Sequence, residues 1–175
     1  MLQPHINSNE SSQKSVPDKQ LAVDVWKKVV DVQMHFNDLS LRLRSVAITV
    51  LGTLLGAAAA AFKFGGTIKI LNYEEPTAAI FFSISIIVWM AFFWIDRYWY
   101  HELLKGAVHH GQEIEEKLKA EIPEIALAIK IREQSHQSFF GMNAAKKLNI
   151  FYWGIFLIQL LGLILVLLVD ETALS

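Results

Sequence analysis

A group of histidines near the middle of the chain, with one glutamate, has the residue types best suited to chemistry. His109 and Glu113 are four residues apart, which places both on one face of a helix where they would share a divalent cation. His110, or His101 of a neighbouring copy, would complete the ligand set. The alternatives are an exposed polar helix face and a histidine charge switch at a helix interface.

No known catalytic motif fits these residues. HELLK, from His101, begins like the zinc-protease pattern HExxH, but Lys105 stands where the second histidine ligand is needed. The pairs Arg97 with His101 and Arg132 with His136 each have only three residues between them, too few for the arginine–histidine spacing of HEPN nucleases. The chain has no cysteine, which excludes thiolate metal sites and cysteine nucleophiles. We expect no enzyme activity, no cofactor and no bound metal.

Composition points instead to a membrane. Hydrophobic residues make up 53% of the chain and charged residues only 19%, with a mean hydropathy of +0.34. The net charge of -1 argues against direct nucleic-acid binding. Residues 45–62, 76–95 and 148–169 are uncharged and close to the roughly 20 residues that cross a bilayer. The sequence predicts an all-α integral membrane protein with three transmembrane helices. For the alanine-rich first window, a buried hairpin helix is the alternative.

Charge distribution sets the expected organisation and orientation. Lysine and arginine gather before the first window and between the second and third, which is typical of cytoplasmic segments. Asp96 and Arg97 are expected to mark the point where the second window meets water. The predicted parts are a disordered tail (1–17), a cytoplasmic amphipathic helix (18–44), a transmembrane hairpin (45–98), a cytoplasmic helical region (99–147), a third transmembrane helix (148–169) and an outer tail (170–175). The N-terminus and residues 97–147 would be cytoplasmic, and the C-terminus outside.

Two stripes with heptad spacing flank the hairpin. The first consists of Val25, Val29, Val32, Phe36, Leu39 and Leu43, on a helix expected to begin near Asp18. The second consists of Tyr100, Leu104, Ala107, Gly111, Ile114 and Leu118. Small side chains at Ala107 and Gly111 would let another helix approach closely. The stripes therefore predict a coiled-coil-like cytoplasmic pair, within one chain or between chains. The alternative for the first stripe is a helix lying on lipid headgroups. A further helix is expected from Pro123.

Polar residues within the windows are few. Gly52 and Gly56 form a GxxxG pair that favours close helix packing, while Ser83, Ser85 and Gln159 can hydrogen-bond between helices. The windows contain no charged residue, which argues against an ion-coupled transporter. A passive pore built from several copies and a purely structural anchor both remain open.

The layout resembles that of SLATT-type and related small membrane proteins of bacterial anti-phage loci. The likeness covers residues 23–118: a cytoplasmic helix, a close transmembrane hairpin and a basic helix beginning RYWYHELLKGAVHHG. The third window departs from the two-span pattern of that family. The resemblance implies an oligomeric inner-membrane effector that forms a pore or disrupts the membrane of an infected cell. The alternative is a membrane anchor or scaffold that recruits and regulates a cytosolic defence protein from the same locus.

Overall fold

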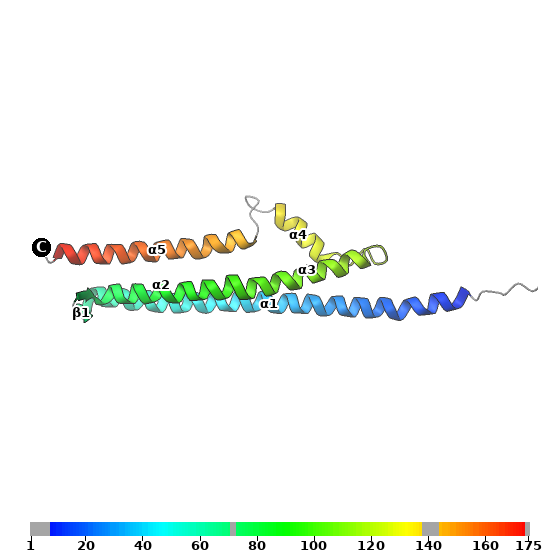
Figure 1. The fold of residues 1–175 in the computed structure, drawn as a ribbon, viewed down its shortest axis with the longest axis horizontal. Helices are drawn as coiled ribbons and strands as arrows, with labels where there is room; N and C mark the ends of the chain where they lie inside the picture. The colour runs from blue at the N-terminus through cyan, green and yellow to red at the C-terminus, as the bar shows by residue number, and fades with distance from the viewer. Residues whose placement is uncertain (1–7, 71–72, 138–143, 174–175) are drawn as a thin grey trace, which may run out of the picture. The chain divides into compact units, whose positions relative to one another are not determined.

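A computed structural model describes residues 8–70, 73–137 and 144–173, and this part of the chain is mostly helical. The elements follow one another along the chain as labelled in Figure 1. They are α1 (Ser8–Phe64), β1 (Thr67–Ile70), β2 (Tyr73–Pro76), α2 (Thr77–Ile95), the π-helix η1 (Asp96–Tyr100), α3 (His101–Leu118), α4 (Leu127–Gln137) and α5 (Ala144–Ala173). Two compact units divide the chain. Unit 1 contains α1 up to Asn37, α3 from Leu103 onward and α4. Unit 2 contains the rest of α1, the two strands, α2, η1 and α5.

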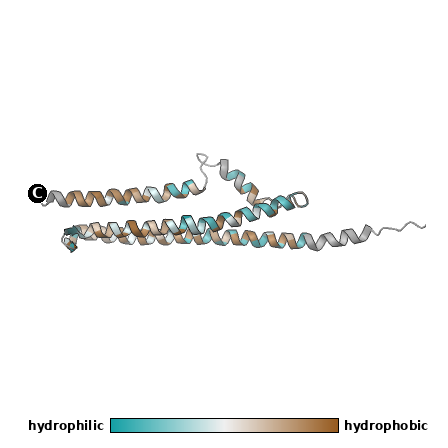
Figure 2. Ribbon diagram, viewed as in Figure 1, coloured by the Kyte–Doolittle hydropathy of each residue, from teal (hydrophilic) through white to brown (hydrophobic). Residues whose placement is uncertain are grey.

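Three of the helices are long and apolar enough to cross a membrane. They contain residues 45–62, 77–95 and 148–169 of the predicted windows, and the apolar stretch of α5 is mostly brown in Figure 2. Only 17%, 22% and 17% of the most apolar window of each helix is buried within the protein. Most of this apolar surface is therefore left for something outside the chain to cover.

The first helix is longer than its sequence predicts. It begins at Ser8 and not near Asp18 as predicted. Residues 1–7 of that tail lie outside the described structure. Adding residues to an existing helix costs little free energy, because each new residue brings one hydrogen bond. A polar sequence can therefore extend α1 although it carries no apolar stripe.

A short β-hairpin joins α1 to α2 within the predicted transmembrane hairpin. Ile68 pairs with Glu75 and Lys69 with Glu74 in the antiparallel register. Gly66 has a φ of +59°, a left-handed conformation that glycine adopts without steric cost. Thr77 closes the loop, because its hydroxyl donates to the carbonyls of Gly65 and Gly66 at 2.9 Å. The hairpin thus returns the chain antiparallel to α1.

Unit 2 packs α1, α2 and α5 around two apolar clusters. The larger is formed by Ala47, Leu51, Trp89, Phe93, Leu148 and Tyr152, and the smaller by Ala78, Ala79 and Val166. Trp89 and Tyr152 have ring centroids 4.8 Å apart, and the indole N–H of Trp89 donates to the Tyr152 carbonyl at 2.9 Å. Gly162 lets α5 approach α2, since a Cβ there would lie 2.6 Å from the Phe82 ring. Aromatic packing thus defines how these three helices meet.

Unit 1 is held by contacts of α3 with both α1 and α4. Gln33 Nε2 donates to the Ala107 carbonyl at 3.1 Å, and Gly111 lies against Gln33 and Val29. The fourth helix begins at Leu127 rather than at Pro123 as predicted, because the preceding residues form turns after α3. Its first backbone N–H groups are bonded by a side chain of α3, described below.

Candidate functional site

A buried ion pair lies among the apolar helices of unit 2. Arg44 Nε donates to Asp96 Oδ2 at 2.7 Å, and its Nη2 donates to Oδ1 at 3.3 Å. The hydroxyl of Tyr152 donates to the same Oδ2 at 3.0 Å. The Asp96 side chain is completely buried, whereas the Arg44 side chain is 31% exposed. One carboxylate therefore links α1, the start of η1 and α5 by three hydrogen bonds from side chains.

The π-helix helps to explain why Asp96 faces inward. Asp96 is its first residue, and the His101 N–H bonds to the Asp96 carbonyl five residues back. A π-turn inserts an extra residue into the helical path, and such turns are frequent at functional sites. His101 is also buried, at the point where α3 begins.

Burial of Asp96 corrects the expectation that this residue meets water where the second window ends. The signal for the ion pair was nevertheless present in the sequence. Arg44 directly precedes the first apolar window and Asp96 directly follows the second. A hairpin brings the two outer ends of its helices to the same level, so opposite charges at these positions can pair. Tyr152 carried no such signal, because its contact depends on how α5 packs.

A second buried carboxylate stabilises unit 1, and it forms no ion pair with any lysine, arginine or histidine that the structure describes. Glu115 Oε1 accepts from Trp26 Nε1 at 3.0 Å and from the Ala128 N–H at 2.9 Å, and Oε2 accepts from the Ile129 N–H at 3.0 Å. Glu115 is fully buried. The free N–H groups at a helix N-terminus carry partial positive charge, which favours an anion there. Glu115 therefore joins α1, α3 and the N-terminus of α4.

Sequence reasoning missed Glu115 because nothing local distinguishes it. It stands in the acidic run EIEEK beside two other glutamates, Glu113 and Glu116, which are both exposed. Only the direction in which its side chain points, toward the end of α4, makes it different.

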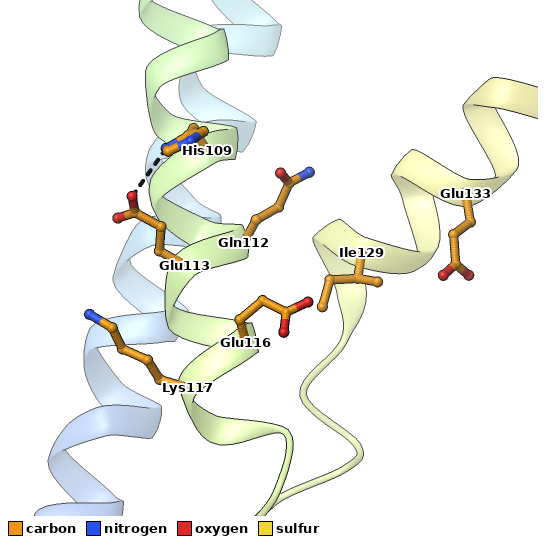
Figure 3. A pocket seen from close by; sticks show the side chains of 7 residues that line it. All are labelled: His109, Gln112, Glu113, Glu116, Lys117, Ile129 and Glu133. Carbon is orange, nitrogen blue, oxygen red and sulfur yellow. Dashed lines mark ion pairs between the residues drawn. The ribbon is translucent and has the colours of Figure 1, made fainter.

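The histidine group lies on an exposed face of α3. His109 Nδ1 is 3.3 Å from Glu113 Oε1, and His110 Nδ1 is 3.5 Å from Oε2. His109 and Glu113 line an open, charged cavity of about 760 Å³ between α3 and α4, shown in Figure 3. Among the residues that the structure describes, no three His, Asp or Glu side chains come together to hold a metal ion. His101 belongs to unit 2, whereas His109, His110 and Glu113 belong to unit 1.

The residues predicted to pack helices differ in their surroundings. Val25 and Val32 are exposed, and α1 instead contacts the other helices of unit 1 through Trp26, Val29 and Gln33. Gly111 is buried, and the half-buried members of the two stripes are Val29, Phe36, Leu39, Leu43, Tyr100, Leu104, Ala107, Ile114 and Leu118.

The glycine pair of the first window lies on an exposed face of α1. A Cβ at Gly52 or Gly56 would have no neighbour within 4 Å. Ser85 and Gln159, in contrast, meet between α2 and α5, with the serine hydroxyl donating to Gln159 Oε1 at 2.7 Å.

No protein-family model, curated protein or solved structure matches the chain.

Proposed function

We propose that this chain is an integral protein of the bacterial inner membrane, that copies associate, and that the assembly permeabilises the bilayer. The carrying observation is that the three long helices have apolar windows in which only 17%, 22% and 17% of the window is buried within the protein. Contiguous apolar surface on that scale is not stable in water and marks a membrane or protein interface. The hydrocarbon core of a bilayer, which takes about 20 helical residues, would cover the apolar window of each helix.

Two exposed faces of unit 2 differ in a way that supports association. The outer face of α5 carries bulky apolar side chains, among them Leu157, Leu161 and Leu165, which suit lipid. The exposed face of α1 carries small or hydroxyl-bearing residues instead, which are Ser45, Thr49, Gly52, Thr53, Gly56 and Ala60. Interfaces between membrane helices are enriched in such small residues, because they let backbones approach closely.

A pore is consistent with the polarity of the same α1 face. The hydroxyls of Thr49 and Thr53 each donate to the carbonyl four residues earlier, at 3.0 Å, so their own helix satisfies them. A face of this kind tolerates either a neighbouring helix or water. Asp96 is already neutralised by Arg44 in the interior of unit 2, so the proposed conduction is passive.

The proposed setting is anti-phage defence, in which loss of the membrane barrier halts growth of an infected cell. Its support is the resemblance in layout of residues 23–118 to SLATT-type proteins. The proposed orientation, with the N-terminus and residues 97–147 in the cytoplasm and the C-terminus outside, is supported by the distribution of lysine and arginine.

The alternative function is a membrane anchor that recruits a cytosolic defence protein. One specific observation favours it: Leu21, Val25 and Val32 of α1 remain exposed in unit 1. These side chains recur on one side of the helix and would be covered by a partner helix.

The decisive experiment combines a glycine substitution with a measurement of membrane potential. The double variant Gly52→Leu/Gly56→Leu adds bulk where a single chain has open space, so it should leave the fold intact. Gly154→Leu on α5 is the matched control, because that glycine also has no neighbour within 4 Å. We expect the double variant to have the mass of a monomer in nanodiscs and to leave the membrane potential of cells, reported by a dye, unchanged. The control variant should still form the oligomer and depolarise cells.

Two other results would decide against a pore. If the wild-type protein, expressed with its trigger, leaves the membrane potential unchanged, the anchor function is favoured. If the double variant keeps its oligomer mass, the small-residue face of α1 is not the interface.

The proposed orientation has its own test. Because the chain has no cysteine, single cysteines introduced at Lys69 and Lys117 would report by labelling which side of the membrane each position faces.

A further inference from the structure

The exposed aromatic side chains of unit 2 lie in two separate sets. In the part of the chain that the structure describes, seven Trp, Tyr and Phe side chains are exposed, by between 46% and 80%, and all seven belong to unit 2. In the described helices between the two sets, the exposed large apolar side chains are all aliphatic, such as Ile87 on α2 and Leu161 on α5. The Asp96-side set consists of Trp94, Tyr98, Trp99 and Trp153, and the hairpin-side set of Phe62, Phe64 and Tyr73.

The Asp96-side set belongs to a row of rings that crosses from α2 to α5. Trp94 and Tyr98 have ring centroids 6.3 Å apart, and Phe93 lies 6.3 Å from the rings of both Tyr98 and Trp153. Asp96 stands between Trp94 and Tyr98 in the chain, and its buried ion pair reaches α1. The row and the ion pair therefore mark one common level on α1, α2 and α5.

The hairpin-side set marks a second level on the same three helices. Phe62 and Phe64 are in the last turn of α1, and Tyr73 is the first residue of β2. Val166 of α5 and Ala78 of α2 share an apolar cluster at this end of unit 2. All three helices therefore pass both levels.

The separation of the two levels matches the apolar thickness of a bilayer. Trp94 follows Thr77 by 17 residues on α2, and Phe62 follows Arg44 by 18 residues on α1. At about 1.5 Å per helical residue, these intervals correspond to roughly 26 and 27 Å. The hydrocarbon core of a bilayer is about 30 Å thick. The stretches between the levels, residues 45–61 and 77–93, contain no charged residue.

Each set also has a cation beside one of its rings. The Arg97 guanidinium lies 5.5 Å from the Tyr98 ring centroid, and Lys63 Nζ lies 5.2 Å from the Phe64 ring centroid. Tryptophan and tyrosine prefer the boundary between hydrocarbon and headgroups, where lysine and arginine can meet lipid phosphates. The two sets therefore have the composition of two membrane–water interfaces.

The β-hairpin adds apolar surface at the second level. Directly opposed residues of an antiparallel pair point to the same face, so the register puts Ile68, Ile70 and Tyr73 together with Glu75. Lys69 points to the other face. An isolated two-stranded hairpin is only marginally stable in water. Contact with lipid would cover the isoleucines and leave Lys69 hydrated.

We propose that the two aromatic sets contact the headgroup layers on the two sides of one phospholipid bilayer, and that the β-hairpin lies in the layer on its own side with its isoleucines toward the hydrocarbon. The ion pair of Asp96 is then level with the opposite headgroup layer, enclosed by protein. These positions rest on the membrane insertion proposed above, and they add where each boundary of the bilayer lies on the fold.

The test measures the depth of single positions in the full-length protein. Because the chain has no cysteine, single cysteines at exposed residues can each carry a spin label. The protein is placed in vesicles of phosphatidylethanolamine and phosphatidylglycerol, and spin relaxation by oxygen is compared with relaxation by a polar nickel chelate. Oxygen enters hydrocarbon and the chelate stays in water, so the oxygen-to-chelate ratio rises with depth.

The expected ratio is highest between the two levels. It should be highest at Ile87 and Leu161, intermediate at Trp99 and Tyr73, and lowest at Lys28, which is exposed in unit 1. We expect about a tenfold difference between the first pair and Lys28, because a polar solute is excluded from hydrocarbon.

Two adjacent hairpin residues provide a matched pair. Ile68 and Lys69 are both exposed and point to opposite faces of β1. The label at Ile68 should have a ratio severalfold higher than the label at Lys69. Equal ratios at the two positions would overturn the placement of the hairpin in the headgroup layer.

The same measurements separate a wrong placement from a failure of membrane insertion. If Ile87 and Leu161 have the ratio of Lys28, the chain is not inserted, and the proposed function fails together with the placement. If Ile87 and Leu161 are deep but Trp99 or Tyr73 has the same ratio as they do, or the same ratio as Lys28, insertion stands and the boundaries proposed here are overturned.

Discussion

Two completely buried carboxylates, one in each unit, are stabilised by different kinds of hydrogen-bond donor. Asp96 in unit 2 receives three hydrogen bonds from side chains, two of them from the guanidinium of Arg44. Glu115 in unit 1 also receives three, but from an indole and two backbone N–H groups. Each carboxylate joins three parts of the chain. Both carboxylates accept three hydrogen bonds. Asp96 accepts two of them from a cationic side chain, whereas Glu115 accepts all three from neutral groups.

The difference follows from which backbone groups each site can reach. In the continuous helices around Asp96, backbone N–H groups already bond within their own helix, so only side chains can donate. Glu115 points at the first turn of α4, where N–H groups have no partner within the helix. Asp96 therefore needs the cationic side chain of Arg44, whereas Glu115 needs no cationic side chain. Replacing the donors one at a time should therefore have unequal effects in the two units.

The largest expected effect is that of Arg44→Met. It leaves the buried Asp96 carboxylate with only the Tyr152 hydroxyl, and breaking a buried ion pair in this way typically costs about 3–5 kcal/mol. The measurement is unfolding of the detergent-solubilised protein by SDS, followed by circular dichroism. Arg42→Met is the matched control, because Arg42 is exposed on the same helix, and should change stability by less than about 0.5 kcal/mol.

A double variant separates loss of the pair from loss of packing. Arg44→Met/Asp96→Leu removes both charges, and such apolar replacements are often close to neutral, so it should recover most of the lost stability. If the double variant is less stable than Arg44→Met alone, Asp96 contributes through something other than the ion pair.

Glu115→Gln should have the next largest effect, and a local one. The amide keeps one oxygen acceptor but places an NH₂ donor opposite the Ile129 N–H, which costs about 1–3 kcal/mol. Hydrogen exchange of the α4 amides should then become about ten- to a hundredfold faster. Glu116→Gln changes the exposed neighbour and should leave this exchange unchanged. Equal protection in both variants would show that α4 does not depend on Glu115.

Removing the uncharged side-chain donor of each carboxylate gives a smaller, paired comparison. Tyr152→Phe takes one hydrogen bond from Asp96, and Trp26→Phe takes one from Glu115. Each change should cost about 1 kcal/mol, because two donors remain in both sites. SDS unfolding measures the first and hydrogen exchange of α4 the second. If Tyr152→Phe loses as much stability as Arg44→Met, the two residues contribute equally and Arg44 does not dominate the site in unit 2.

The smallest effects are expected at glycines, where each unit offers a matched pair. Gly111 and Gly162 are in close contact with a neighbouring helix, while Gly106 and Gly154 have open space. Alanine at the two packed positions should destabilise by about 1 kcal/mol through overpacking. Alanine at the two open positions should stabilise by up to about 1 kcal/mol, because glycine is a poor helix former. The same unfolding and exchange measurements report the four variants.

The limits of prediction are visible in single residues. Residues 45–62, 76–95 and 148–169 could be recognised as long apolar helices, because their composition is independent of any contact. The hairpin strands could not, since four-residue segments carry too little pattern. The start of α1 at Ser8 was missed because a polar extension has no apolar period. The partners of Gly111 could not be predicted either. Heptad spacing places Gly111 on a packing stripe but does not show which side chains of another helix contact it.

What the sequence determined by itself is the helical class, the three apolar segments and the small residues along them, because these follow from composition and local periodicity. What only the tertiary structure decided is the state of the polar groups. Asp96 and Glu115 look like ordinary acidic residues beside basic or acidic neighbours. They became buried anchors because helices distant in sequence brought Arg44, Tyr152 and the N-terminus of α4 within hydrogen-bond distance. The positions of Arg44 and Asp96 at the outer ends of the hairpin already allowed them to pair. Tyr152 and the N-terminus of α4 became partners only through long-range geometry, which no local pattern encodes.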